Sequence, residues 1–262
     1  MKRIYVCNDD VTGLFSAIYD AWCGVLMKGE RERGIRFRGH IEQELFCEYV
    51  EVCENEKKTS AVERLILKNM GWYAYKELYQ AALASDVKKG DAILGTMLAA
   101  REIPDSRRIM DHLSNCYVEK VFELSRAVGT EALSWTEFIR FRELENGILY
   151  AKFKPKSRVM TLVAPHFADR LSIENWMIYD ETYQEYAVHE AGKQWVLVQG
   201  ERLNEEKTKV FSDKELEYQR LWRQFTTSIA IEERRNPKCQ MGHLPLWYRK
   251  NMVEFDMAKQ NN

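Results

Sequence analysis

Residues 135–155 read W-T-E-F-I-R-F-R-E-L-E-N-G-I-L-Y-A-K-F-K-P, and their change from a helical to a strand pattern indicates the fold class. The first part of this stretch continues a helical pattern over Glu131–Leu144, and Gly147 is typical of the residue that ends a helix. Its second part, Ile148–Lys154, has the character of a strand, which Pro155 ends. A helix that turns into a strand in this way predicts an α+β protein.

The chain that follows predicts a small sheet. Val159–Arg170 has helical spacing, and Pro165 should divide it into two short helices or kink it. Together with Ile148–Lys154, three later segments predict a C-terminal antiparallel sheet of about four strands. These segments are Trp176–Tyr179, Glu185–Glu190 and Gln194–Gln199. A long helix should follow, capped by Asp213.

The N-terminal region predicts a β-turn-α-β-β unit. The expected elements are a strand over Arg3–Cys7, a helix over Leu14–Met27 capped by Thr12, and strands over Ile35–Arg38 and Leu45–Val52. A helical middle should run from about Ser60, its cap, to Ser125, with a bend or a break at Gly71 and a break at Gly129-Thr130 before the next helix. We expect two domains, residues 1–88 and 89–255, which meet near the short polar segment Lys88–Asp91.

Composition excludes several classes of function. Lys and Arg number 39 and Asp and Glu number 40, so the net charge is −1 and a nucleic-acid surface would need local segregation of charge. The six cysteines form no C-x-x-C pair and should be reduced and mostly buried. The spacing of the histidines is not that of a metal site. The sequence also contains no glycine-rich loop of the kind that binds phosphate, so we expect no cofactor. Without a signal peptide or an apolar span, we expect a cytoplasmic protein with no membrane partner.

Arg140 and Arg142, on either side of Phe141, form the first candidate binding cluster. Two guanidinium groups can grip phosphates, and a neighbouring aromatic ring can stack on a base. The structural alternative is that the cations favour a helix C-terminus and pair with Glu143 or Glu145.

His166, Asp169 and Arg170 form the second cluster. A histidine beside an acid and an arginine can transfer a proton or bind an anion, so His166 and Asp169 are the candidate catalytic residues. The alternative is a hydrogen-bonded structural histidine beside the packed Phe167.

The third cluster is the basic C-terminal segment. Between Lys214 and Lys250 the chain has eight basic and four acidic residues, with aromatic residues interleaved. This pattern is typical of nucleic-acid backbone binding, although a solvated helix face and an ordered C-terminal wrap would look the same. Its candidate binding residues are Arg234, Arg235, Asn236, Lys238, Arg249 and Lys250.

The sequence resembles a bacterial family of DNA metabolism or DNA repair proteins of unknown function. The resemblance is carried by I-Y-V-C-N-D-D-V-T-G-L-F-S-A-I-Y-D-A-W, F-I-R-F-R-E-L-E-N-G-I-L-Y-A, A-P-H-F-A-D-R, W-M-I-Y-D, R-N-P-K-C-Q and L-P-L-W-Y. It implies a role in DNA metabolism beside a radical S-adenosylmethionine (SAM) protein encoded next to it. In other bacteria a similar C-terminal region is fused to a uracil-DNA-glycosylase-like domain. The resemblance supplies no catalytic residues.

Three functions follow as hypotheses. The first is a DNA-binding or DNA-processing protein that acts with the radical SAM partner through the basic clusters. The second is an enzyme that acts directly on DNA, a hydrolase or a base-removing enzyme, using His166. The third is a structural subunit that docks the radical SAM protein without touching DNA.

Overall fold

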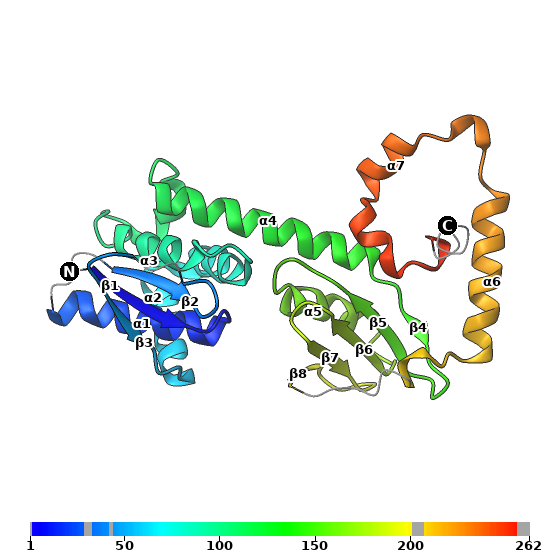
Figure 1. The fold of residues 1–262 in the computed structure, drawn as a ribbon, viewed down its shortest axis with the longest axis horizontal. Coiled ribbons are helices and arrows are strands. Elements are labelled where there is room, and N and C mark those ends of the chain that lie inside the picture. The colour runs from blue at the N-terminus through cyan, green and yellow to red at the C-terminus, as the bar shows by residue number, and fades with distance from the viewer. Residues whose placement is uncertain (1, 29–32, 42–43, 201–206, 256–262) are drawn as a thin grey trace. The chain divides into compact units, whose positions relative to one another are not determined.

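The computed structural model describes residues 2–28, 33–41, 44–200 and 207–255. Its internal contacts divide the chain into two compact units, Met1–Thr130 and Glu131–Asn262, which are described separately below (Figure 1). The boundary falls within one continuous helix, α4 (Cys116–Phe138). The chain combines helices with two sheets, which confirms the predicted α+β class.

The sheet of the first unit is parallel. The central strand β1 (Lys2–Cys7) pairs with β2 (Arg33–Phe37) on one side and with β3 (Cys47–Glu51) on the other. The helix α1 (Val11–Lys28) connects β1 to β2, as a parallel pair requires. These elements confirm the predicted β-turn-α-β-β unit.

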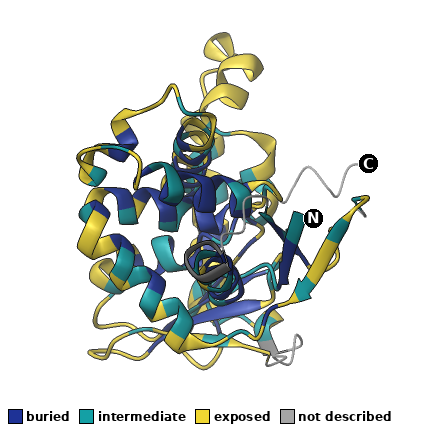
Figure 2. Cartoon of the chain, turned by 90° about the vertical axis from the view of Figure 1, so that its left-hand side faces the viewer, coloured by how far each residue is buried: buried dark blue, intermediate teal, exposed yellow. Residues whose placement is uncertain are grey.

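Helices supply most of the buried surface of the first unit. They are α1, α2 (Glu56–Leu83), α3 (Lys89–Ala99), the short 3-10 helix η1 (Ser106–Asp111) and the first part of α4. Leu14, Phe15 and Ile18 of α1 are fully buried, as are Ile66 and Leu78 of α2. Figure 2 shows this pattern as helices that are buried on one side and exposed on the other.

Three predicted caps were wrong by a few residues. Asp10, and not Thr12, caps α1, because its Oδ1 accepts the Gly13 amide at 2.7 Å. Asn55 caps α2 ahead of Ser60, and Ser212 caps α6 (Asp213–Ser228) in place of Asp213. In each case a better-placed Asn, Asp or Ser precedes the predicted cap, and these side chains accept the amides of the first turn.

Helix interruptions were predicted at a glycine in each of the two long helices, α2 and α4, and only the one in α2 is observed. The predicted bend or break at Gly71 is confirmed as a kink, since this residue has φ 81° and ψ 175° inside α2. The predicted break at Gly129 is wrong, because α4 runs through it without interruption. Val128 and Ala132 are buried on either side, and this packing offsets the modest cost of a glycine in a helix.

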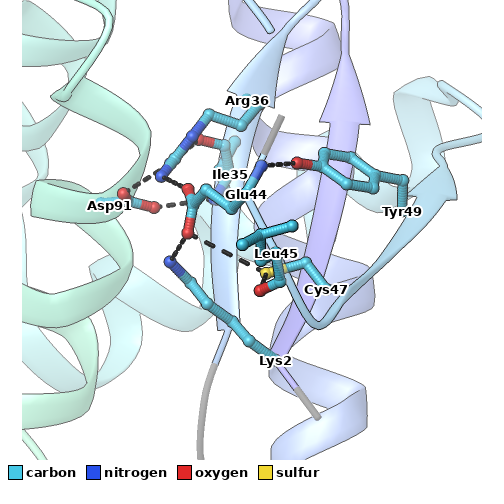
Figure 3. A network of polar contacts seen from close by, with 8 residues as sticks. All are labelled: Lys2, Ile35, Arg36, Glu44, Leu45, Cys47, Tyr49 and Asp91. Carbon is cyan, nitrogen blue, oxygen red and sulfur yellow. Dashed lines mark hydrogen bonds and ion pairs between the residues drawn. The ribbon is translucent and has the colours of Figure 1, made fainter. Parts of the chain in front are cut away.

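A network of side chains surrounds β2 (Figure 3). The Ile35 amide donates to Asp91 Oδ1 at 2.7 Å, and the Ile35 carbonyl accepts from Arg36 Nη1 at 2.9 Å. The same guanidinium pairs with Asp91 Oδ2 at 2.7 Å and with Glu44, which also pairs with Lys2. The network therefore links β1, β2 and α3 to the segment before β3.

The second unit holds a five-stranded mixed sheet in the order β4-β5-β6-β7-β8. The strands are β4 (Arg142–Glu143), β5 (Leu149–Phe153), β6 (Trp176–Asp180), β7 (Glu185–His189) and β8 (Val196–Gln199). The predicted sheet of about four antiparallel strands is corrected in two respects. The sheet has a fifth strand, β4, and β5 runs parallel to β6 because α5 (Met160–Arg170) crosses between them.

The two faces of this sheet differ. Phe153, Ile178 and Ala187 are fully buried on the face against which α5 packs with Val163 and Phe167. Side chains alternate along a strand, so Tyr150, Tyr179 and Tyr186 point to the opposite face. That opposite face carries the candidate site, where Tyr150 and Tyr186 are buried and Tyr179 is partly exposed.

The C-terminal segment returns to the sheet. After α6 come η3 (Glu232–Arg234), α7 (Pro237–His243) and η4 (Leu246–Asn251). Tyr248 packs on Trp135, with ring centroids 4.6 Å apart. The Asn251 amide donates to the Lys152 carbonyl at 2.9 Å, and Met252 is fully buried. These contacts place η4 beside the end of β5.

Candidate functional site

A cavity of about 720 Å³ lies on the tyrosine-bearing face of the sheet. We call it the sheet cavity. All of its walls belong to the second unit, and they include four cationic and four aromatic side chains together with one carboxylate. The cations are Arg140, Arg142, Lys152 and Lys209, the aromatic residues are Tyr150, Tyr179, Tyr186 and Phe211, and the acid is Glu181.

Strand register brings the floor of the sheet cavity together. Lys152 of β5 lies opposite Tyr179 of β6, and Tyr179 lies opposite Tyr186 of β7. The rings of Tyr179 and Tyr186 stack, with centroids 4.5 Å apart and planes 19° apart. Cross-strand neighbours on one face are close enough to act as a unit. Three adjacent strands thus present a cation beside a stacked pair of phenol rings.

Two arginines line the wall, Arg140 between α4 and β4 and Arg142 in β4. Arg142 donates from Nη2 to the Asn251 carbonyl at 3.2 Å, and its guanidinium lies over the Phe211 ring at 5.6 Å. Arg140 donates from Nη1 to the Glu137 carbonyl at 2.8 Å, and its Nε lies 3.9 Å from a Glu254 carboxylate oxygen. These contacts fix both side chains on one side of the sheet cavity.

Glu181 is balanced by two lysines. Its carboxylate lies 3.7 Å from Lys152 Nζ and 3.0 Å from Lys250 Nζ. Among the described lining residues four cations outnumber the single acid. Two charges just outside the lining offset each other, since Lys250 contacts Glu181 and Glu254 lies beside Arg140. The chain as a whole is nearly neutral, so the sheet cavity is a place where positive charge is locally concentrated.

Burial changes the pKa of one tyrosine on the floor of the sheet cavity. Burial raises the pKa of Tyr150 to about 12, against a smaller lowering by a hydrogen bond with Thr208. A tyrosine is protonated at neutral pH in any case, and the raised pKa extends this protonated range, so the phenol can donate a hydrogen bond to an anionic oxygen.

The structure brings together part of the predicted binding set. Arg140 and Arg142 line the sheet cavity, and Lys250 reaches its rim through Glu181. Arg249 does not line the cavity. Its Nε donates to the Leu244 carbonyl at 3.0 Å, and its guanidinium lies over the Phe255 ring at 4.8 Å.

The α5 cluster lies elsewhere. His166, Asp169 and Arg170 are exposed on α5, whose buried side packs on the other face of the sheet. The His166 ring meets Phe167 edge-on at 5.1 Å. None of the three lines the sheet cavity, so the roles assigned to them stay predictions.

The four candidates near α7 are also exposed. Arg235 pairs with Glu232 at 3.0 Å, and Asn236 caps α7 by accepting the Cys239 amide at 3.1 Å. Arg234 and Lys238 lie on the same segment. These residues do not line the sheet cavity, and their binding role stays a prediction.

Sequence reasoning missed six of the eight cationic and aromatic residues that line the sheet cavity. A signal existed for three tyrosines, because Tyr150, Tyr179 and Tyr186 occupy one alternating face of strands that were predicted correctly. Lys152 shares that face. Lys209 and Phe211 had no such signal, since they lie in the segment that joins β8 to α6.

Metal ligands, membrane-spanning helices and cysteine pairs are the other features that could indicate a function. In the described ranges no group of three or more His, Cys, Asp or Glu side chains is arranged to hold a metal ion. Nor does any described helix have the length and hydrophobicity to cross a membrane. All six cysteines are unpaired. The prediction that they are mostly buried is wrong, because Cys7 alone is buried while Cys53, Cys116 and Cys239 are exposed.

Comparison with known proteins gives a family for the chain. No curated protein matches it. The family model of DUF4130, described as a domain of unknown function, matches residues 88–254, a segment that contains the whole sheet cavity. The domain boundary expected between residues 88 and 89 stays a prediction. Since the match covers more than half of its length, the chain belongs to the DUF4130 family.

Proposed function

We propose that the sheet cavity binds a nucleic acid in a process of DNA metabolism. The observation that carries the proposal is the meeting of Arg140, Arg142, Lys152 and Lys209 with a stacked pair of tyrosines in one cavity. Cations that follow the backbone and rings that stack on bases are the two elements of single-strand binding.

Each group would have a distinct task. The arginines would hold phosphate oxygens in forked hydrogen bonds, and the lysines would act as point charges. A base would extend the stack of Tyr179 and Tyr186, a contact of about 1–3 kcal/mol. Glu181 would repel phosphate, so its pairs with Lys152 and Lys250 favour binding by neutralising it.

Titration of a labelled single-stranded oligonucleotide, followed by fluorescence anisotropy over a salt series, tests the proposal. Lys152→Ala should weaken binding and reduce the salt slope by about 0.7, since it removes one phosphate contact on a single strand. Lys193→Ala is the matched control, because Lys193 is exposed in the turn before β8 and is absent from the sheet cavity.

Tyr179 separates stacking from charge. Tyr179→Leu should weaken binding about tenfold without changing the salt slope, whereas Tyr179→Phe should retain affinity. The proposal fails if the wild type does not bind at low salt, or if Lys193→Ala weakens binding as much as Lys152→Ala. The same titration with Arg170→Ala decides whether the α5 cluster contributes.

The resemblance to DNA metabolism proteins adds a partner to the proposal, a radical SAM protein. Co-expression with a radical SAM protein of the kind that the resemblance places beside this family, followed by affinity purification after nuclease treatment, should recover both proteins. Recovery of this chain alone would remove the partner from the proposal. It would leave DNA binding by the sheet cavity unaffected, because that is measured on the purified chain.

A further inference from the structure

The sheet cavity has the size of a pocket for a single small ligand. Its volume of about 720 Å³ falls within the range of about 300–1,000 Å³ that is usual for such pockets. A groove that follows a continuous single strand is longer, and in the OB fold it covers about 4–16 nucleotides. The sheet cavity therefore suits one or two nucleotides and not a long stretch of strand.

The segment between β8 and α6 bounds the cavity from above the sheet. Thr208 of this segment forms a hydrogen bond with the Tyr150 side chain, which belongs to the floor. Three residues further on, Phe211 pairs with Leu144, which follows the edge strand β4. The described part of the segment thus lies over the tyrosine-bearing face.

A second set of contacts bounds the cavity where β5 and β6 end. Lys250 of η4 pairs with Glu181 of the turn after β6 at 3.0 Å, and the Asn251 side-chain amide donates to the Lys152 carbonyl at 2.9 Å. These contacts join η4 to the ends of both strands. An internal stretch of a nucleic-acid strand needs an entrance and an exit, whereas a strand end needs only an entrance. A wall on this side therefore favours a strand end.

The charge of the cavity also favours a strand end. The four cations and the single acid of its described lining leave an excess of three positive charges. An internal phosphodiester carries one negative charge, whereas a phosphomonoester carries about 1.5 to 2 at pH 7. A terminal phosphate and the diester beside it together supply about three negative charges, which matches the excess. Two internal diesters supply only about two.

Two of the cations keep donors that can hold a terminal phosphate. Arg140 donates from Nη1 to the Glu137 and Ile139 carbonyls, while its Nη2 has no hydrogen-bond partner among the described residues. Lys209 likewise forms no hydrogen bond or ion pair within the part of the chain that the structure describes. A phosphomonoester offers three acceptor oxygens, and a guanidinium fork with an ammonium group suits them.

We infer that the sheet cavity binds the phosphorylated end of a single strand, with the terminal phosphate on Arg140 and Lys209 and the first base stacked on Tyr179. The inference rests on the proposed binding of nucleic acid and adds which part of the strand enters. A 5′ phosphate and a 3′ phosphate present the same group, so both are included.

Competition measured by fluorescence anisotropy tests the inference on the full chain. Four unlabelled oligonucleotides of one sequence compete with an internally labelled, phosphorylated strand. They carry a 5′ phosphate, a 3′ phosphate or only hydroxyl ends, or they are closed into a circle without ends. One phosphorylated strand should compete at least about tenfold better than the hydroxyl strand and the circle, because the monoester adds charge-assisted hydrogen bonds. The better of the two phosphorylated strands identifies the end.

Two variants test the residues. Arg140→Gln and Lys209→Gln should each weaken the phosphorylated strand about tenfold more than the hydroxyl strand, so that the preference disappears. Lys209 is exposed, so its variant should fold normally. Lys193→Ala should keep the preference, because Lys193 does not line the cavity.

The outcomes separate this inference from the proposed function. Equal competition by phosphorylated strands, hydroxyl strand and circle would overturn the inference and leave nucleic-acid binding intact. A preference that survives both Arg140→Gln and Lys209→Gln would also overturn it. If the labelled strand does not bind at all, the proposed function itself fails.

Discussion

At the scale of single residues, Asp180 is the most unusual side chain of the second unit. It is fully buried at the end of β6, opposite the buried Glu185 of β7. Its Oδ1 accepts the amides of Thr182 and Tyr183 at 2.7 and 3.1 Å, while Oδ2 has no hydrogen-bond partner among the described residues. Arg158 lies 3.5 Å from Glu185 and compensates that acid in part. Burial raises the pKa of Asp180 to about 7.

This pKa predicts how stability depends on pH. The ordinary pKa of an unfolded aspartate is about 3.9, so the folded chain holds an extra proton between about pH 4 and pH 7. The contribution of Asp180 to the free energy of unfolding is fully present below pH 4 and is lost as the pH rises through 7. Asp180→Asn keeps the Oδ1 acceptor and stays neutral, so it should flatten this loss and stabilise the chain by up to about 4 kcal/mol at pH 8.

Urea unfolding at a series of pH values between 4 and 8 measures this effect. Asp169→Asn is the control, because Asp169 is exposed on α5. A wild-type profile that rises with pH through this window, or an Asp180→Asn profile parallel to it, would contradict the prediction.

At the scale of elements, two glycines predict opposite effects of one substitution. Gly71 has a backbone conformation that is almost confined to glycine, while an added Cβ would meet only Arg107 Cγ at 4.0 Å. Gly71→Ala should therefore destabilise the chain by about 1–3 kcal/mol through backbone strain alone. Gly129 is helical and its added Cβ would meet Gln80 at 3.8 Å, so Gly129→Ala should stabilise by about 0.5–1 kcal/mol.

The denaturation midpoints of the two variants test both predictions, provided that the dependence of the unfolding free energy on denaturant concentration is the same as in the wild type. If Gly71→Ala proved neutral, the bend in α2 would not be a property of the native helix. If Gly129→Ala were destabilising, the space around α4 would be tighter than the structure shows.

Most elements could be predicted from local pattern, but the direction of one strand could not. Ile148–Lys154 and Trp176–Tyr179 were recognised as strands, yet they were expected to run antiparallel. The connection between them contains α5, and a helical crossover is what a parallel pair requires. Pro165 made the parallel pairing harder to predict, because it suggested a broken or kinked helix where α5 is continuous.

At the scale of the whole molecule, the sheet cavity shows what sequence patterns omit. Arg140 and Arg142 were predicted because they are neighbours in sequence. Lys152 and Lys209 join them only through strand pairing and the return of the chain after β8. Charge segregation of this kind depends on contacts between distant segments, so a nearly neutral composition concealed it.

The network around Ile35 has a consequence for how these molecules behave in a crowded solution. β2 is an edge strand of its sheet. The unpaired amides and carbonyls of an edge strand can form hydrogen bonds with a strand of another chain, which leads to aggregation. Asp91 and Arg36 occupy the Ile35 amide and carbonyl, and charged side chains surround them. The side chains that link the segments of the first unit therefore also protect the edge strand β2 at Ile35 against pairing with other chains.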